Sequence, residues 1–131
     1  MTNPGVDSPN DEVHRVGGIG DWLDYHALHH GGQEALVVGE LRLTYAQLLG
    51  RVDRMAGVLV ARGVRKGDRV AMLLLNGNEF LETLFACARL GAIAVPINFR
   101  LSPAEVEFIL GDCGAQVLVY HCQFTPLVAP I

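Results

Sequence analysis

The sequence predicts an α/β protein built around a parallel sheet. Three short apolar runs, at 70–75, 92–95 and 117–120, alternate along the chain with segments whose apolar residues recur at helical spacing. This alternation is typical of parallel strands joined by helical crossovers. The runs are continuously apolar, as strands with both faces covered are. With 131 residues, the chain is long enough for one domain with a substantial core.

Residues 1–20 are rich in Pro, Gly, Asn and Asp and lack apolar periodicity, so we expect a flexible tail there. The Gly-Gly-Ile-Gly sequence at 17–20 resembles part of a phosphate loop, but no strand precedes it, and a linker is favoured. We expect the folded domain to span residues 21–131. Its first helix is predicted to begin with Asp21 as the cap and to end at the glycines 31 and 32.

A β-hairpin is predicted next, because two short apolar runs at 35–38 and 41–43 flank Gly39 and Glu40. A two-residue connection with glycine in first place fits a type II′ turn.

A long helix follows the hairpin. Thr44 and Gln47 have the spacing of a capping box at its start, and Gly63 suits its end. Its apolar residues recur at helical spacing: Tyr45, Leu48, Leu49, Val52, Ala56 and Leu59. Its other side carries Arg51, Asp53, Arg54 and Arg62.

The next helix is predicted from Asn78, as the cap, to Leu90, with Gly91 ending it. The residues predicted to face inward are Phe80, Leu81, Leu84, Phe85 and Ala88. Glu79 and Glu82 are predicted to lie on a solvated face of the first turn, where the helix dipole favours carboxylates.

A further helix is predicted to start at Ser102-Pro103-Ala104-Glu105. These residues place Ser at the N-cap, Pro in the first helical position and Glu in the third. The apolar stripe of this helix consists of Val106, Ile109 and Leu110, and either Gly111 or Gly114 ends it.

Composition excludes several classes of protein. Half of the residues are hydrophobic, 18% are charged and the mean hydropathy is +0.30, which excludes a disordered chain or a coiled coil. The net charge is −4 and the longest basic run is Arg65-Lys66, so no nucleic-acid partner is expected. Cys87, Cys113 and Cys122 are odd in number and lie in apolar or helical settings, which indicates reduced thiols.

Neither an export signal nor a membrane segment is expected. The N-terminus has no basic start followed by an apolar core. The most apolar stretch, at 84–97, is interrupted by Arg89, Gly91 and Pro96 and is too short to cross a bilayer. The sequence therefore predicts a cytoplasmic protein without a transmembrane segment.

The ends of the predicted strands are the first place to look for a ligand site. They carry Asn-Gly-Asn at 76–78, Pro-Ile-Asn at 96–98 and His121. Residues 76–78 open a helix, so their backbone N–H groups could receive an anion, although a plain strand-to-helix turn is favoured.

Other reactive side chains give weak signals. His26, His29 and His30 could share a helix face and hold a metal, but no further ligand lies nearby and a solvated helix end is favoured. Cys87 is predicted to be a small core residue, and neither Cys113 nor Cys122 has a base to activate it. The residues themselves therefore predict no catalytic, cofactor-binding or metal site.

Three stretches of the sequence, in their order along the chain, resemble the sequences of a known superfamily. They are LTYAQL at 43–48, GVRKGDRVAMLLLN at 63–76 and NEFLETLFACARLGAIAVPINFRLSPAEVEFIL at 78–110. Together they resemble the beginning of the AMP-forming adenylating enzymes, and the resemblance covers residues 21–120. Pro-Ile-Asn at 96–98 with Arg-Leu-Ser-Pro at 100–103 resembles the acyl-CoA ligase branch, which activates fatty acids.

The resemblance implies a partial αβα subdomain with a parallel sheet, preceded by a helix and a hairpin, as at the start of the acyl-CoA synthetase large domain. Members of the family use ATP and Mg to form an acyl-adenylate and then transfer the acyl group to CoA. They hold the phosphates with a Gly/Ser/Thr-rich loop ending in Lys, because backbone amides and a cation offset the charge.

This sequence departs from the family in lacking that loop and the other catalytic motifs. No catalytic, cofactor-binding or metal-binding residue is therefore carried over, and no cofactor is expected to bind this chain. The matched residues are structural: Thr44 and Ser102 as caps, Gly63 and Gly91 as helix ends, and Pro96 at the close of a strand.

Three hypotheses for function follow. The chain is either a truncated N-terminal part of an acyl-CoA ligase, inactive alone, or a non-catalytic module that binds the remainder of a split ligase or a paralogue. The third hypothesis, an unrelated flavodoxin-like protein, would require flavin or nucleotide binding. The apolar helix at 78–90 would leave apolar surface exposed on a lone chain, so self-association is expected.

Overall fold

The computed structural model describes residues 18–131. At its centre is a three-stranded parallel sheet in the order β4-β3-β5. Strand β3 (Arg69–Leu73) lies between β4 (Ile93–Pro96) and β5 (Val117–Tyr120). Ala71 of β3 is in register with Val95 on one side and with Leu118 on the other. The predicted parallel α/β sheet is therefore confirmed.

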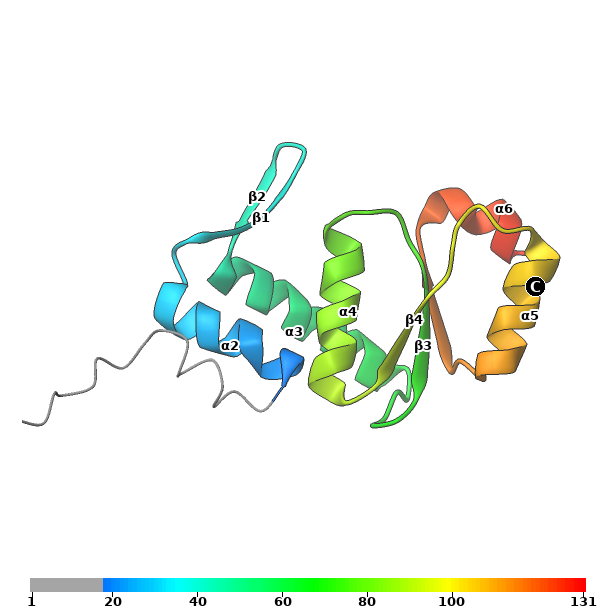
Figure 1. The fold of residues 1–131 in the computed structure, drawn as a ribbon, viewed down its shortest axis with the longest axis horizontal. Helices are drawn as coiled ribbons and strands as arrows, with labels where there is room; N and C mark the ends of the chain where they lie inside the picture. The colour runs from blue at the N-terminus through cyan, green and yellow to red at the C-terminus, as the bar shows by residue number, and fades with distance from the viewer. Residues whose placement is uncertain (1–17) are drawn as a thin grey trace, which may run out of the picture.

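Helices cover both faces of the sheet (Figure 1). On one side lie α2 (Ile19–His30), α3 (Tyr45–Ala61) and α4 (Asn78–Leu90). On the other side lie α5 (Pro103–Cys113), the 3₁₀ turn η1 (Cys122–Phe124) and the short helix α6 (Thr125–Val128). Each side has its own hydrophobic core: Val70 of β3 belongs to one, and Ala71 and Leu73 belong to the other, as the alternation of a strand requires.

Only the central strand is covered as the sequence predicted. Residues 70–73 of β3 are fully buried, and a strand buried on both faces is continuously apolar. By contrast, β4 and β5 are the two edges of the described sheet, and their residues are half-buried or exposed. Ile93 of β4 is 50% exposed. The expectation that all three strands are covered was wrong because sequence does not reveal which strand is central.

The hairpin forms where it was predicted. Strands β1 (Glu34–Val38) and β2 (Leu41–Thr44) pair antiparallel, with Val38 opposite Leu41. Gly39 has φ of +58°, whereas Glu40 does not have a positive φ. This combination agrees with a type II′ turn and excludes type I′, which needs positive φ at both central residues.

Two predicted capping boxes are present. At the start of α3, the Gln47 amide donates to Thr44 Oγ1 (3.2 Å) and the Thr44 amide donates to Gln47 Oε1 (2.9 Å). At the start of α5, the Glu105 amide donates to Ser102 Oγ (3.4 Å) and the Ser102 amide donates to Glu105 Oε2 (2.8 Å). Hydrogen bonds from the Ser102 backbone and hydroxyl lower the pKa of Glu105. The boxes satisfy amides that would otherwise lack partners at each helix start.

Two other helix starts differ from the prediction, and the structure decides one helix end that was left open. Helix α2 begins at Ile19, so Asp21 lies in its first turn, and residues 19 and 20 belong to the helix. The rest of the predicted tail, residues 1–17, lies outside the described residues. Gly77 is the N-cap of α4, and Asn78 is its first residue. Of the two glycines considered for the end of α5, Gly114 is the cap, with φ of +61°.

The buried side of α4 was also predicted wrongly, except at Phe85, which packs against the core on that side of the sheet. Its buried side chains after the first residue are Thr83, Ala86 and Cys87, whereas the large apolar residues expected to face inward are only partly buried. Ala86 and Cys87 share a core with Val52 and Leu59 of α3. We infer that small side chains were favoured because they let the two helices approach closely. The prediction of Cys87 as a core residue is confirmed.

The capping boxes provide a test of the fold. Thr44→Ala and Ser102→Ala should each lower the free energy of unfolding by about 1 kcal/mol, because each substitution leaves a helix amide without its acceptor. Urea denaturation measures the change. Glu107→Ala is the control: Glu107 is exposed in α5 and should change stability by less than about 0.5 kcal/mol. Equal effects of Ser102→Ala and Glu107→Ala would contradict a stabilising cap.

Candidate functional site

The carboxyl ends of the three parallel strands meet at one edge of the sheet, where α/β proteins commonly bind ligands. The polar side chains at two of these ends serve their own loops. Asn98 Oδ1 accepts a hydrogen bond from the Arg100 amide (3.0 Å). His121 Nδ1 accepts one from the Gln123 amide (3.2 Å). These contacts fix the turns after β4 and β5 and give the side chains a structural role.

The third strand end leads into α4 and borders a hollow of about 360 Å³. Its lining comes from the hairpin and from the start of α4: Leu36, Val37, Val38, Asn76, Gly77, Phe80 and Leu81. The carboxylate of Glu79 lies within about 3 Å of where a side chain at Gly77 would begin. A negative group therefore already stands at this helix start, which favours the strand-to-helix turn over an anion site.

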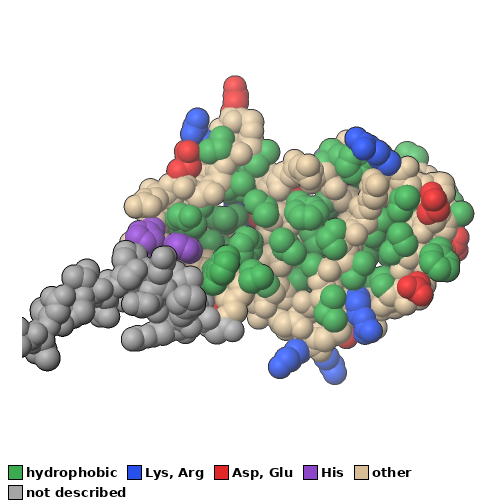
Figure 2. All heavy atoms as spheres, viewed as in Figure 1, with side chains coloured by type: hydrophobic (Ala, Val, Ile, Leu, Met, Phe, Trp, Pro, Cys, Tyr) green, Lys and Arg blue, Asp and Glu red, His purple; other side chains and the backbone are tan. Residues whose placement is uncertain are grey.

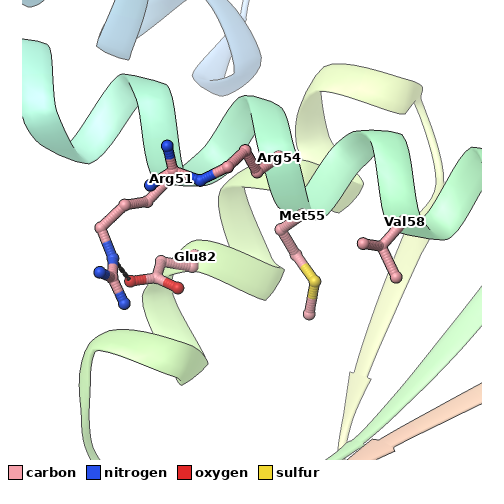
Figure 3. Close-up of a pocket in the computed structure, with 5 residues that line it drawn as sticks. All are labelled: Arg51, Arg54, Met55, Val58 and Glu82. Carbon is pink, nitrogen blue, oxygen red and sulfur yellow. Dashed lines mark hydrogen bonds and ion pairs between the residues drawn. The ribbon is translucent and has the colours of Figure 1, made fainter.

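A more polar hollow, of about 250 Å³, lies between α3 and α4 (Figure 3). Arg51 of α3 points across it and forms an ion pair with Glu82 of α4. The side-chain Nδ2 of Asn78 donates a second hydrogen bond to the same oxygen of Glu82, Oε1 (3.0 Å). The Glu82 side chain is only 12% exposed. The prediction that Glu82 lies on a solvated face was therefore wrong, because its partner is 31 residues away in sequence.

A second ion-pair group joins three helices. Arg89 of α4 pairs with Asp24 of α2 and with Asp53 of α3, the latter at 3.0 Å. Asp53 had been predicted only to face away from the apolar side of α3. Both ion-pair groups tie neighbouring helices together, and their carboxylates are engaged by arginines. Their chemistry is therefore that of structural cross-links.

The remaining candidates do not form a site within residues 18–131. No group of three or more His, Cys, Asp or Glu side chains there could hold a metal ion. The His26 ring stacks on Tyr45, with centroids 5.0 Å apart, and lies 5.7 Å from the His30 ring. All three cysteines are free, and burial raises the pKa of Cys87 to about 11, which makes its thiol unreactive at neutral pH.

A third hollow, of about 380 Å³, is largely apolar and lies along α5. Its lining residues are Leu101, Ala104, Glu105, Phe108 and Ile109.

No helix among residues 18–131 is long and apolar enough to cross a membrane.

Comparison with known proteins identifies the family. The sequence model of the family described as AMP-binding enzyme matches residues 23–129, which is most of the chain. The chain belongs to the AMP-binding enzyme family. Among curated members of this family, a long-chain-fatty-acid–CoA ligase, FadD13 of Mycobacterium tuberculosis, is 47% identical over 92 residues. A feruloyl-CoA synthase of an Amycolatopsis species is 45% identical over 114 residues.

Solved structures of AMP-binding enzymes have the same fold. A fatty acyl CoA synthetase of Mycobacterium tuberculosis matches 86% of this chain with a TM-score of 0.83 and 43% identity. The N-terminal domain of FACL13 from the same organism matches with a TM-score of 0.82 and 42% identity. The chain therefore has the fold of the N-terminal part of acyl-CoA ligases, as the resemblance implied.

The match covers only part of each relative. The alignments include 70% and 87% of this chain but 18% of FadD13 and 23% of the feruloyl-CoA synthase. The chain thus spans about a fifth of the length of these AMP-binding relatives. It also covers 29% of the FACL13 N-terminal domain.

The two kinds of ion pair in this structure should differ measurably. Double-mutant cycles should give a coupling of about 1–2 kcal/mol for Arg51 with Glu82, because this pair is largely shielded from solvent. The control is Arg42 with Glu34 on the hairpin, whose side chains are 65% and 49% exposed and whose coupling should be about 0.5 kcal/mol or less. Urea denaturation of the single and double variants gives both values. Equal couplings would contradict a structural role for Glu82.

Proposed function

We propose that this chain forms the N-terminal α/β part of an acyl-CoA ligase and has no adenylating activity by itself. Its fold and family place it with enzymes that join carboxylic acids to CoA. Reaction with ATP, Mg and CoA would require segments that supply the catalytic groups. The proposed role of this chain is to complete the fold of such an enzyme, in the cytoplasm.

The position of lysine is the observation that carries this proposal. The family's phosphate loop ends in a Lys, because a cation must offset the phosphate charge. This sequence contains one lysine, Lys66. Lys66 lies in the turn before β3, and its side-chain carbons lie close to Gly91, which precedes β4. That turn is at the amino end of the parallel strands, opposite the edge where α/β sheets bind ligands.

The chain's partner is the second part of the proposal. Its partner would be the remainder of a split ligase or an intact paralogue. This view is supported by the fraction of each relative that the chain covers, which is about a fifth. Membership in the AMP-binding family replaces the hypothesis of an unrelated flavodoxin-like protein.

Acid-dependent exchange between ATP and pyrophosphate tests the proposal. The purified chain should give no exchange above an enzyme-free blank with long-chain fatty acids or with ferulate, because it lacks a phosphate-binding lysine at the ligand edge. A full-length acyl-CoA ligase is the positive control. Acid-dependent exchange by the purified chain alone would overturn the proposal.

A further inference from the structure

Helix α4 has a second apolar side that faces away from its buried side. We call Phe80, Leu81, Leu84 and Ala88 the outer face of α4. Leu81, Leu84 and Ala88 are spaced by three and four residues, so they follow one side of the helix. All four side chains are partly buried, yet none packs against the buried residues of either core described above. Phe85 and Leu90, by contrast, pack against the core shared with α3.

The outer face carries no charge. Two of the three charged residues of α4, Glu82 and Arg89, are engaged by α3 and α2 on its inner side. The third, Glu79, lies beside Gly77 at the start of the helix. Figure 2 shows hydrophobic side chains gathered over α4 and β4, with the charged side chains around them. A surface helix with such a face would normally carry polar residues there.

Neighbouring elements extend this apolar surface. At one end, the hollow of about 360 Å³ lies between the outer face and the hairpin residues Leu36, Val37 and Val38. At its side lies β4, an edge strand that packs against α4 and whose Ala94 side chain faces the α4 layer. The hairpin, α4 and the edge strand β4 follow one another in the fold (Figure 1), and apolar side chains of the hairpin and the outer face line the hollow between the first two. Apolar surfaces of this kind mark interaction sites.

We propose that this surface is the docking site for the remaining portion of an acyl-CoA ligase AMP-binding domain. The inference rests on the proposed function and names the surface that joins this chain to its partner. The chain covers 29% of the FACL13 N-terminal domain, so more than two thirds of that domain lies outside the match. An uncharged face of large apolar residues has the character of a domain interior, whereas exchangeable interfaces are about as polar as the rest of a protein surface.

The test uses a defined partner: the FACL13 N-terminal domain without the segment that matches this chain, co-expressed with it. We expect a complex of one chain with one partner in analytical ultracentrifugation. Leu84→Glu should weaken that complex at least about tenfold, because it places a charge in the centre of the interface. The matched control is Leu28→Glu, since Leu28 of α2 is 80% exposed and should not affect the complex.

Four results would overturn the proposal. One is a dimer of the chain that leaves the partner unbound, which would make a second copy the occupant, and another is a monomer that does not bind. A third is a complex that Leu28→Glu weakens as much as Leu84→Glu does. If a thermal scan shows that Leu84→Glu does not fold, hydroxyl-radical footprinting of the unmodified complex decides. Protection of the outer face but not of Leu28 supports the docking site, and equal labelling of the two overturns it.

The outcome is separable from that of the proposed function. Acid-dependent exchange between ATP and pyrophosphate by the chain alone would refute the proposed inactivity and would say nothing of this surface. Failure to form the complex, with exchange absent, would refute only the docking site.

Discussion

The burial of β3 is the constraint on which the rest of the structure depends. Residues 70–73 are fully buried, and β3 pairs with both of the other strands in the described sheet. Burying a side chain of the size of Val, Leu or Met stabilises a protein by roughly 1.5–3 kcal/mol. The two cores meet at this strand, because its successive side chains point to opposite faces. The helices of both layers are thus held against one element.

The layer formed by α2, α3 and α4 leaves one apolar side of α4 without a packing partner in either core. Small side chains on α4 pack against α3. Arg51 of α3 pairs with the Glu82 carboxylate of α4, and Arg89 of α4 pairs with carboxylates of α2 and α3, so ion pairs cross-link the three helices. The same arrangement leaves the larger apolar side chains of α4 turned outward. A helix face of large apolar residues normally packs against a core, and here that face of α4 has no core among the described residues to pack against.

Local features of this fold could be predicted from the sequence, and long-range ones could not. Both capping boxes and the hairpin turn depend on residues within three positions, so Thr44, Ser102 and Gly39 were assigned correctly. The inner face of α4 was missed because its large apolar residues gather on the side opposite Glu82 and Arg89, which indicated a core on that side, whereas small side chains pack against α3. Glu82 was missed because its partner lies on another helix. For the site, the sequence alone showed that the family's catalytic motifs are absent from it, whereas the outer face of α4 could be identified only from the structure.

Native-state hydrogen exchange tests the central role of β3 most directly. Because β3 is covered on both faces and paired on both edges, its amides at 70–73 should exchange only on global unfolding and be the slowest of the chain. The amides of the hairpin β1–β2, where Val37 and Leu41 are exposed, should exchange much faster. Exchange at β3 as fast as in the hairpin would contradict the account, because the two cores would then not depend on this strand.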